Sequence, residues 1–347
     1  MKKKIYYLLS ILFAAWFFSS CEKDVAIPES PEPPVPIATD TVIIDNVSYF
    51  DSTIDFYSVW FTDANTGYVC GNKGTILKTA NGGNSWSKLN IQDTLQFNTI
   101  YFIDQNIGFA GGKSSIFKTT DGGNTWLRKE NNTWFYDGIN DISFINDTIG
   151  YACGCCGFDM NSFLPVFLKT TNGGESWVWL DKYGFPTNGF SLYFTNNIGI
   201  VVGGSGGVNN NIIKTTDGGA NWIDLYPGIN LSWTSVFFTS IQTGYVVGTY
   251  SQYLGVLLKT TNSGNTWSQT TLDSTHYFED VYFASNSKGF ISGENGILLY
   301  STDGGNSWKK LNTNTTNILS AIHFPISNIG YVVGANGTII KITITNQ

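Results

Sequence analysis

The chain of 347 residues carries 26 acidic residues against 19 basic ones, and only Arg128 is an arginine. Such a chain is a poor partner for nucleic acid, because that binding depends on clustered lysine and arginine. Helical periodicity is absent throughout, and the length suffices for one large β domain.

Residues 1–20 predict an export signal. Three lysines precede an apolar run from Ile5 to Phe18, which is too short to span a membrane with normal flanks, and two serines lead to Cys21. This segment resembles a bacterial lipoprotein signal, which implies cleavage before Cys21 and acylation of its thiol. We therefore expect a lipid-anchored protein of the cell outer membrane, on its periplasmic or its external face. An ordinary secretory signal cut nearby is the alternative.

Residues 21–40 predict a tether. Five prolines alternate with acidic residues there, a composition that cannot build a core and favours an extended, semi-rigid chain. Without the three lysines of the signal, 16 basic residues face 26 acidic ones, a net charge of −10. The folded domain is expected over residues 41–347.

An Asx-Gly-Gly turn followed after two residues by tryptophan recurs along the chain. The tryptophans are spaced by 40, 51, 45, 45 and 41 residues, the period of a four-stranded propeller blade. In each turn we expect the Asx side chain to accept backbone N–H groups, the glycines to supply positive φ and the tryptophan to bury its ring. The alternative is a ring of carboxylates that binds calcium, but half of these positions carry a neutral amide. The structural Asx residues are Asn81, Asp121, Asn172, Asp217, Asn262 and Asp303.

The second strand of the repeat begins seven times, against six tryptophan turns. The seventh repeat ends before its fourth strand, and Thr41–Val47 is a spare apolar strand near the other end of the domain. We predict an all-β, seven-bladed propeller of four-stranded antiparallel blades, with Thr41–Val47 completing the last blade so that no sheet edge stays open.

These turns resemble the Asp-box, or BNR, repeat, and the string Gly-Tyr-Val-x-Gly…Lys-Thr-Thr-Asp-Gly-Gly-x-x-Trp is similar to photosystem II assembly-factor-like propellers. The resemblance covers nearly all of residues 53–343 and implies the fold, not an activity. Sialidases of this class need an arginine cluster, and the assembly factors use an arginine-rich patch. A single arginine argues against both properties here.

The innermost strands place one polar column on the central channel. Asp141 and Asp280 are its best-placed carboxylates, but they lie on the third and sixth blades, whereas glycosidase pairs are about 5–10 Å apart. A solvated channel lining is therefore the preferred interpretation. With only two histidines, His276 and His323, we expect no metal, no cofactor and no catalytic triad. The polar column comprises Ser58, Thr99, Asp141, Ser191, Ser235 and Asp280.

The cysteines of the domain fall into two groups. Cys70 and Cys153 occupy the same position of the repeat two blades apart, so we expect both to be small buried residues that do not pair with each other. Cys155 and Cys156 are adjacent in an exported chain. A disulfide between them, a disulfide from one of them to Cys153, and free thiols all stay open.

One face of the propeller is the better candidate for a ligand. The loops between second and third strands vary in length in blades three to five, and loops vary where function is grafted on a rigid scaffold. Aromatic rings beside asparagine and glycine suit sugars or extended peptide, although Trp233 and Phe135 could instead fill the space between blades. The candidate residues are Trp134, Phe135, Tyr136, Tyr183, Phe185, Trp233 and Tyr277.

The sequence thus favours a monomeric, non-catalytic, lipid-anchored propeller that scaffolds a protein partner at the cell envelope. It would meet the membrane through its lipid anchor alone and would not bind nucleic acid. Glycan capture at the cell surface is the second hypothesis. A glycoside hydrolase is the third, and it requires a close carboxylate pair among Asp141, Glu279, Asp280 and Asp159.

Overall fold

The computed structural model describes residues 40–47, 51–91, 95–113, 115–129, 135–159, 162–180, 189–204, 212–225, 231–250, 254–273 and 275–345. Only the backbone is described for 135–137, 155–159, 162–165 and 250. The expected signal and the tether up to residue 39 lie outside these ranges. No helix in the described part is long and apolar enough to cross a membrane.

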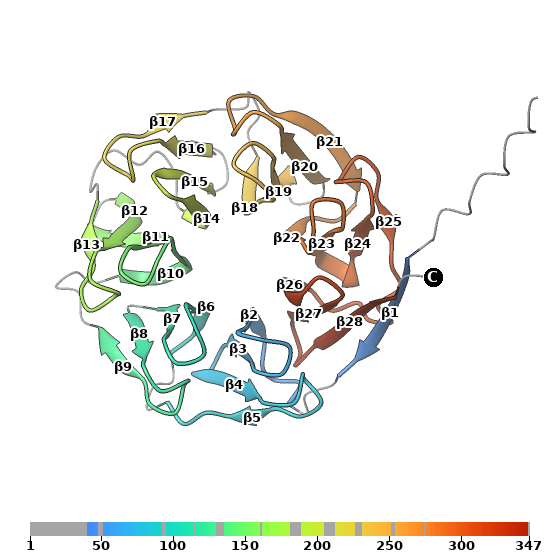
Figure 1. Ribbon diagram of the computed structural model, residues 1–347, viewed down its shortest axis with the longest axis horizontal. Coiled ribbons are helices and arrows are strands. Elements are labelled where there is room, and N and C mark those ends of the chain that lie inside the picture. Colours follow the sequence, from blue (N-terminus) through green and yellow to red (C-terminus); the bar gives the residue numbers. More distant parts are fainter. Residues whose placement is uncertain are drawn as a thin grey trace, which may run out of the picture. The chain divides into compact units, whose positions relative to one another are not determined.

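The described residues from Asp40 onward form seven four-stranded antiparallel sheets arranged as blades around a central channel (Figure 1). This confirms the predicted propeller. Blade 1 contains β2 (Phe56–Phe61), β3 (Gly67–Gly71), β4 (Thr75–Thr79) and β5 (Ser87–Lys88). Blade 2 contains β6 (Phe97–Phe102), β7 (Gly108–Gly112), β8 (Ser115–Thr119) and β9 (Leu127–Lys129). Blade 3 contains β10 (Phe135–Phe144), β11 (Gly150–Asp159), β12 (Ser162–Thr170) and β13 (Val178–Trp179).

Blade 4 contains β14 (Gly189–Thr195), β15 (Ile198–Gly203), β16 (Ile212–Thr215) and β17 (Ile223–Asp224). Blade 5 contains β18 (Ser232–Phe238), β19 (Gly244–Tyr250), β20 (Leu254–Thr260) and β21 (Ser268–Asp273). Blade 6 contains β22 (Phe278–Phe283), β23 (Gly289–Gly293), β24 (Leu298–Ser301) and β25 (Lys309–Lys310), with the 3₁₀ turn η1 (Glu294–Gly296) between β23 and β24. Blade 7 contains β26 (Leu319–Ile326), β27 (Ile329–Gly334), β28 (Ile339–Thr345) and the amino-terminal β1 (Thr41–Asn46).

The ring is closed by β1, which pairs antiparallel with β28 as its outer neighbour and places Ile44 opposite Ile342. The backbone N–H of Val47 extends this pairing with a 2.8 Å bond to the carbonyl of Ile339. Val42 and Ile44 pack on the core of the last blade. The closing strand predicted over Thr41–Val47 is therefore confirmed, and it covers an edge that β28 would otherwise expose.

Each blade packs a phenylalanine at the end of its first strand over a glycine that begins its second. A Cβ on Gly67 would lie 2.4 Å from the ring of Phe61, so only glycine fits there. The ring of Phe61 in turn meets the edge of Trp86 at 5.9 Å between centroids. The second strand is buried on both faces between neighbouring blades, which explains its unbroken apolar sequence.

The Asx turns, called Asp-boxes below, hold themselves together locally. In the first, Oδ1 of Asn81 accepts the backbone N–H of Ser85 at 2.9 Å, and the Thr79 hydroxyl accepts that of Gly83 at 3.0 Å. Amide and carboxylate both offer this oxygen, which explains why Asn and Asp alternate. In the fifth box Ser263 takes a left-handed φ of 61°, where the other boxes have glycine. In the other boxes the same backbone N–H to Oδ1 bond joins Thr125 to Asp121, Ser176 to Asn172, Asn221 to Asp217, Thr266 to Asn262 and Ser307 to Asp303.

Four of the six Asp-boxes also accept hydrogen bonds from a tyrosine and a lysine of the preceding blade. The Tyr68 hydroxyl and the Lys78 ammonium of blade 1 donate to the carbonyl of Gly122 in the second box, at 2.8 and 2.7 Å. We call this arrangement a latch. In this repeat, the tyrosine of Gly-Tyr-Val and the lysine of Lys-Thr-Thr therefore serve to join neighbouring blades at their outer ends. The same latch joins Tyr151 and Lys169 to Gly218, Tyr245 and Lys259 to Gly304, and Tyr331 and Lys341 to Gly82.

Candidate functional site

The innermost strands turn two consecutive residues toward the central channel. In blade 1 the pairing skips a residue between Phe56 and Ser58, opposite Gly71 and Cys70. This bulge recurs at the same place in the other blades. Because a bulge breaks the alternation of side chains, Tyr57 and Ser58 both face the channel, where they line different chambers.

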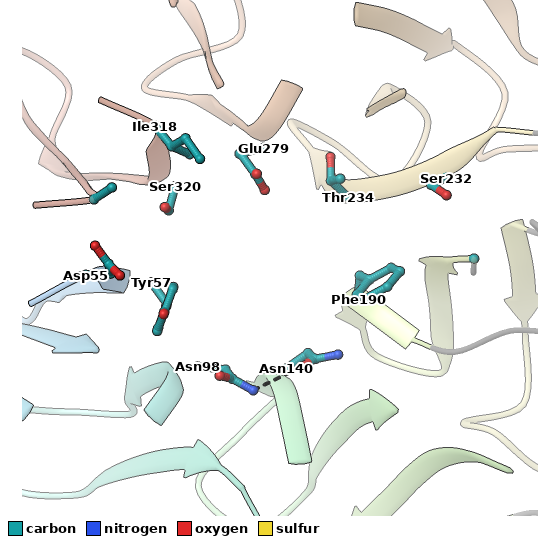
Figure 2. Close-up of a pocket in the computed structure, with 12 residues that line it drawn as sticks. Asp55, Tyr57, Asn98, Asn140, Phe190, Ser232, Thr234, Glu279, Ile318 and Ser320 are labelled. Atoms are coloured by element: carbon teal, nitrogen blue, oxygen red, sulfur yellow. Dashed lines mark hydrogen bonds between the residues drawn. The ribbon is translucent and has the colours of Figure 1, made fainter. Parts of the chain in front are cut away.

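The larger chamber, called the loop-side chamber, has a volume of about 810 Å³. It lies where the innermost strands begin and is bounded by the connections between blades and between second and third strands. This is the face expected to carry a ligand. Figure 2 shows Tyr57, Phe190 and Glu279 around its opening. Its lining comprises Asp55, Tyr57, Asn98, Asn140, Phe190, Gly204, Ser232, Thr234, Glu279, Ile318, Ser320 and Ala335.

The loop-side chamber is acidic. Asp55 and Glu279 line it, and no lysine or arginine is among its described lining residues. Asp55 is held by the backbone N–H of Asn336 at 3.0 Å and by the Asn72 amide at 3.2 Å. Glu279 has no hydrogen-bond partner among the described residues. Burial raises the pKa of Glu279 to about 7, and the charges of Asp280 and Glu294 add to the effect. This carboxyl group is therefore free to meet a donor from outside.

Other lining residues of the loop-side chamber join neighbouring blades. The Asn98 amide donates to Oδ1 of Asn140 at 3.1 Å (Figure 2), and the Asn140 amide reaches the carbonyl of Gly189 at 3.0 Å. Thr234 donates to the carbonyl of Phe278 at 2.9 Å. Sequence reasoning missed this ring because the bulge that exposes it leaves no mark in the sequence.

The second chamber, called the box-side chamber, has a volume of about 320 Å³ and lies toward the Asp-box face. The polar column predicted from the sequence lies here, with all six of its members in one layer of the wall. Ala321 occupies the equivalent position of blade 7. The layer comprises Ser58, Thr99, Asp141, Ser191, Ser235 and Asp280.

This layer forms hydrogen bonds between blades. The inner strands present an unpaired backbone edge to the channel, and a side chain of the preceding blade satisfies it. The Ser58 hydroxyl accepts the N–H of Ile100 at 3.3 Å, and Oδ2 of Asp280 accepts that of Ile322 at 2.7 Å. Corresponding bonds run to Asp141 from Leu192, to Ser191 from Val236 and to Ser235 from Val281. These side chains therefore hold the blades together, a role the prediction of a solvated lining did not include.

The two channel aspartates are both engaged by protein donors. Asp280 accepts from the Ser235 hydroxyl at 2.6 Å and from the N–H of Val281 at 2.8 Å, in addition to Ile322. Burial raises the pKa of Asp141 to about 7 and that of Asp280 to about 6, although these hydrogen bonds oppose the shift. With both oxygens accepting protein bonds, neither carboxylate is placed as a free nucleophile or acid.

A ring of aromatic residues follows two positions after the polar layer and was missed from the sequence. It borders the box-side chamber and includes Trp60, Tyr101, Tyr193, Phe237 and Tyr282, with His323 in blade 7. Aligning the repeats on their first strands shows this aromatic column directly, so the signal was available.

The aromatic candidates for a ligand face are mostly untested. Trp134, Tyr183 and Phe185 lie outside the described residues, as do the side chains of Phe135 and Tyr136. Tyr277 lies partly exposed on the loop side, ahead of β22, outside the chamber lining. Trp233 was wrongly assigned to the surface: it is fully buried and packs between blades 4 and 5 with Val202 and Leu231. A large ring at a strand start fills the space between wedge-shaped sheets, so position in the repeat decided its burial.

Of the four cysteines in the domain, the structure describes two side chains. Cys70 and Cys153 are fully buried and free in the structure. The side chains of Cys155 and Cys156 lie outside the described residues.

Comparison with known proteins agrees with this architecture. The profile of the family described as "Photosynthesis system II assembly factor YCF48" matches residues 46–133, 222–316 and 273–343, together more than half of the chain. No curated protein matches the sequence.

Solved structures share the fold at low identity. A structure described as "YCF48 bound to D1 peptide" is 18% identical with a TM-score of 0.67, covering 87% of this chain and 97% of that one. YCF48 from Cyanidioschyzon merolae is also 18% identical with a TM-score of 0.67, over 86% of this chain and 98% of that one. A GH74 xyloglucanase from Xanthomonas campestris is 12% identical with a TM-score of 0.67, over 86% of this chain but 53% of that one.

Proposed function

Because the chain belongs to the photosynthesis system II assembly factor YCF48 family, we propose that it is a non-catalytic binding module that holds a protein partner over the loop-side chamber. Two features of the molecule support a binding role. The blades are fastened to one another by latches and by the polar layer, so the chamber is carried on a rigid frame. A structure of a relative contains a bound peptide, which is the kind of occupant proposed here.

The observation that carries the proposal is the carboxyl group of Glu279. It lines a chamber of about 810 Å³ that has no described basic residue, and it has no hydrogen-bond partner within the described part of the chain. Glu279 is half-buried at the chamber wall, and a charge-assisted hydrogen bond from a bound segment would stabilise its carboxylate. We therefore expect the partner to contribute a lysine, an arginine or another hydrogen-bond donor to Glu279.

An array of immobilised peptides tests this function. Peptides rich in lysine and arginine should retain the purified domain better than length-matched peptides rich in glutamate. Glu279→Gln should weaken that retention about three- to tenfold, as expected for loss of a charge-assisted bond. Asp147→Asn is the matched control, because Asp147 is an exposed acid in the β10–β11 loop on the opposite face. Equal loss in both variants, or no preference for basic peptides, would refute the proposal.

Glycan binding or hydrolysis is the second candidate. The favouring observations are the fold likeness to a xyloglucanase and three channel carboxyl groups whose pKa values lie near 6 to 7. The engagement of both oxygens of Asp280 argues against hydrolysis. A glycan array tests binding. Product analysis after incubation with xyloglucan oligosaccharides tests hydrolysis. Product release that Glu279→Gln abolishes would establish the enzyme.

The place of the protein in the cell is a further part of the proposal. We infer that Cys21 is lipidated and anchors the propeller in the outer membrane. Wild-type protein should fractionate with membranes and carry a diacylglyceryl mass on Cys21, while Cys21→Ser should be released in soluble form. Cleavage at another position without lipid would favour the ordinary secretory signal.

A further inference from the structure

The aromatic ring at the box-side chamber forms a continuous wall over five blades. Contacts between ring centroids run from Phe237 to Tyr282 at 4.7 Å, from Tyr282 to His323 at 5.6 Å and from His323 to Trp60 at 4.5 Å. Trp60 then meets Tyr101 at 4.5 Å. The planes of neighbouring rings are inclined to each other by 39° to 61°, as expected for equivalent residues on successive blades of a propeller. We call this wall the aromatic collar.

The collar is fixed in place by its polar atoms. The Tyr101 hydroxyl donates to the carbonyl of Phe144 at 3.4 Å, and the Tyr282 hydroxyl donates to that of Phe324 at 3.3 Å. Nδ1 of His323 accepts the backbone N–H of Phe61 at 3.3 Å. The side chains of the collar are thus held before any ligand arrives, which lowers the entropic cost of binding.

Two polar groups at this chamber have no partner among the described residues. Thr99 is 4% exposed and lines the chamber, yet its hydroxyl makes no hydrogen bond there. In five other blades, the residue equivalent to Thr99 accepts a backbone N–H from the following blade. The corresponding N–H for Thr99 is that of Ile142, but it donates to the carboxylate of Asp141 at 2.8 Å instead. The second group is Nε2 of His323, a residue 7% exposed. Because Nδ1 accepts a hydrogen bond, Nε2 carries the proton and is a donor.

The charge of the chamber selects the sign of a ligand. Asp141 and Asp280 lie in its wall, and no lysine or arginine is among its described lining residues. With a pKa of about 6, Asp280 is the carboxyl group that is mostly ionised near neutral pH. Burial lowers the pKa of His323 to about 3, so the imidazole adds no positive charge near neutral pH. Aromatic faces attract cations, most strongly where water is excluded. A volume of about 320 Å³ is at the low end for ligand pockets and suits one side chain rather than a folded segment.

We propose that the box-side chamber binds the ammonium or guanidinium group of a lysine or arginine side chain from a partner protein. The cation lies against the faces of Trp60 and Tyr282, its N–H groups donate to the Thr99 hydroxyl, and Nε2 of His323 donates to a carbonyl of the segment that bears it. This site lies at the opposite end of the channel from Glu279 and does not depend on the function proposed above.

Calorimetric titration of the folded domain with two blocked amino acids tests the site. Nα-acetyl-arginine N-methylamide should bind saturably, whereas the citrulline analogue, which is nearly isosteric but uncharged, should bind at least about fivefold more weakly. Spermidine distinguishes a free polyamine from a protein side chain. Spermidine binding as tight as that of the arginine amide would overturn the protein origin.

Single substitutions locate the binding. Tyr282→Leu should weaken it at least about fivefold through loss of one aromatic face, whereas Tyr282→Phe should retain it. Thr99→Val should weaken it about threefold without lowering the melting temperature, because the hydroxyl has no partner among the described residues. Leu127→Ala changes an exposed side chain on the outer strand β9 and should leave binding unchanged. Equal binding of the citrulline analogue, no binding at millimolar concentration, or loss of binding in Glu279→Gln but not in Tyr282→Leu would each overturn the proposal.

Discussion

The hydroxyl of Tyr331 in the last blade donates a hydrogen bond of 2.7 Å to the carbonyl oxygen of Gly82 in the first Asp-box. The two residues are 249 positions apart in the sequence. Tyr331 is fully buried, and its ring lies 3.9 Å from that of Phe61. The same kind of latch that joins consecutive blades therefore also closes the ring. It starts from β27, whereas the other closure of the ring is the pairing of β1 with β28.

Removal of this closing latch should destabilise the propeller modestly. Tyr331→Phe keeps the ring and loses the hydroxyl, and the Gly82 carbonyl retains the ammonium of Lys341 at 3.1 Å. We expect the free energy of unfolding to fall by about 1 kcal/mol. Tyr68→Phe, which breaks an internal latch, is the matched variant in urea unfolding. A much larger loss of stability in Tyr331→Phe than in Tyr68→Phe would show that ring closure stabilises the fold by more than one hydrogen bond.

The closing strand offers a second test. Ile44 packs partly on the core of blade 7, whereas its neighbour Ile43 is 43% exposed. Ile44→Thr should therefore lower the free energy of unfolding by about 1–2 kcal/mol, and Ile43→Thr by less than about 0.5 kcal/mol. Thermal unfolding of the two variants measures the difference. Equal effects would contradict the observed facing of β1.

Blade 7 lacks the polar side chain that its neighbours use at the channel. Ala321 stands where five of the other six blades carry a serine or aspartate that accepts a backbone N–H from the following blade. Ala321→Ser should add such a bond to blade 1 and raise the free energy of unfolding by about 0.5–1 kcal/mol. Ser58→Ala is the reciprocal variant and should lower it by a similar amount. An unchanged or lowered stability in Ala321→Ser would count against the role assigned to the polar layer.

Glu279 should make stability depend on pH. Its pKa of about 7 in the folded protein is above the ordinary value of 4.5, so the folded state binds this proton more tightly than the unfolded chain does. The contribution of Glu279 to the free energy of unfolding therefore falls as pH rises from about 4.5 to about 7. Glu279→Gln removes that penalty and should be more stable than wild type at pH 8, by about 1–3 kcal/mol.

At pH 4.5 the two proteins should be nearly equal, because Glu279 is then protonated in the fold. Urea unfolding at both pH values measures the difference. Asp147→Asn, at an exposed position of the β10–β11 loop, again serves as the control variant. An advantage of Glu279→Gln that is the same at both pH values would show that proton binding is not its cause.

The buried thiols should be unreactive. Burial raises the pKa of Cys70 and that of Cys153 above the ordinary value, and thiolate is the reactive form. A thiol reagent should therefore label neither in the folded protein and both after unfolding. The same count, with and without reductant, shows whether Cys155 and Cys156 form a disulfide. Rapid labelling of Cys70 in the native state would contradict its burial.

Much of the architecture was predictable because the repeat carries local information. The Asp-box turn depends on a side chain and a backbone N–H four residues later, as in Asn81 and Ser85, so its structure can be inferred from a short segment. The number of blades followed from the seven second-strand starts, and closure by β1 followed from counting which strand was missing. The site was less predictable. Trp233 has the composition of a binding residue, and only its place between two blades shows that it is core.

The amino-acid sequence alone was enough to specify the repeat, the number of blades and the residues of the polar column, because turns, strand periodicity and spacing act over tens of residues at most. Only the tertiary structure decided what those residues do. A bulge divides Glu279 and Asp280, neighbours in the chain, between two chambers, and ring closure brings Tyr331 to Gly82 and His323 to Phe61. Contacts of this kind join residues more than 200 positions apart, and they exist only once the backbone has completed a full circle.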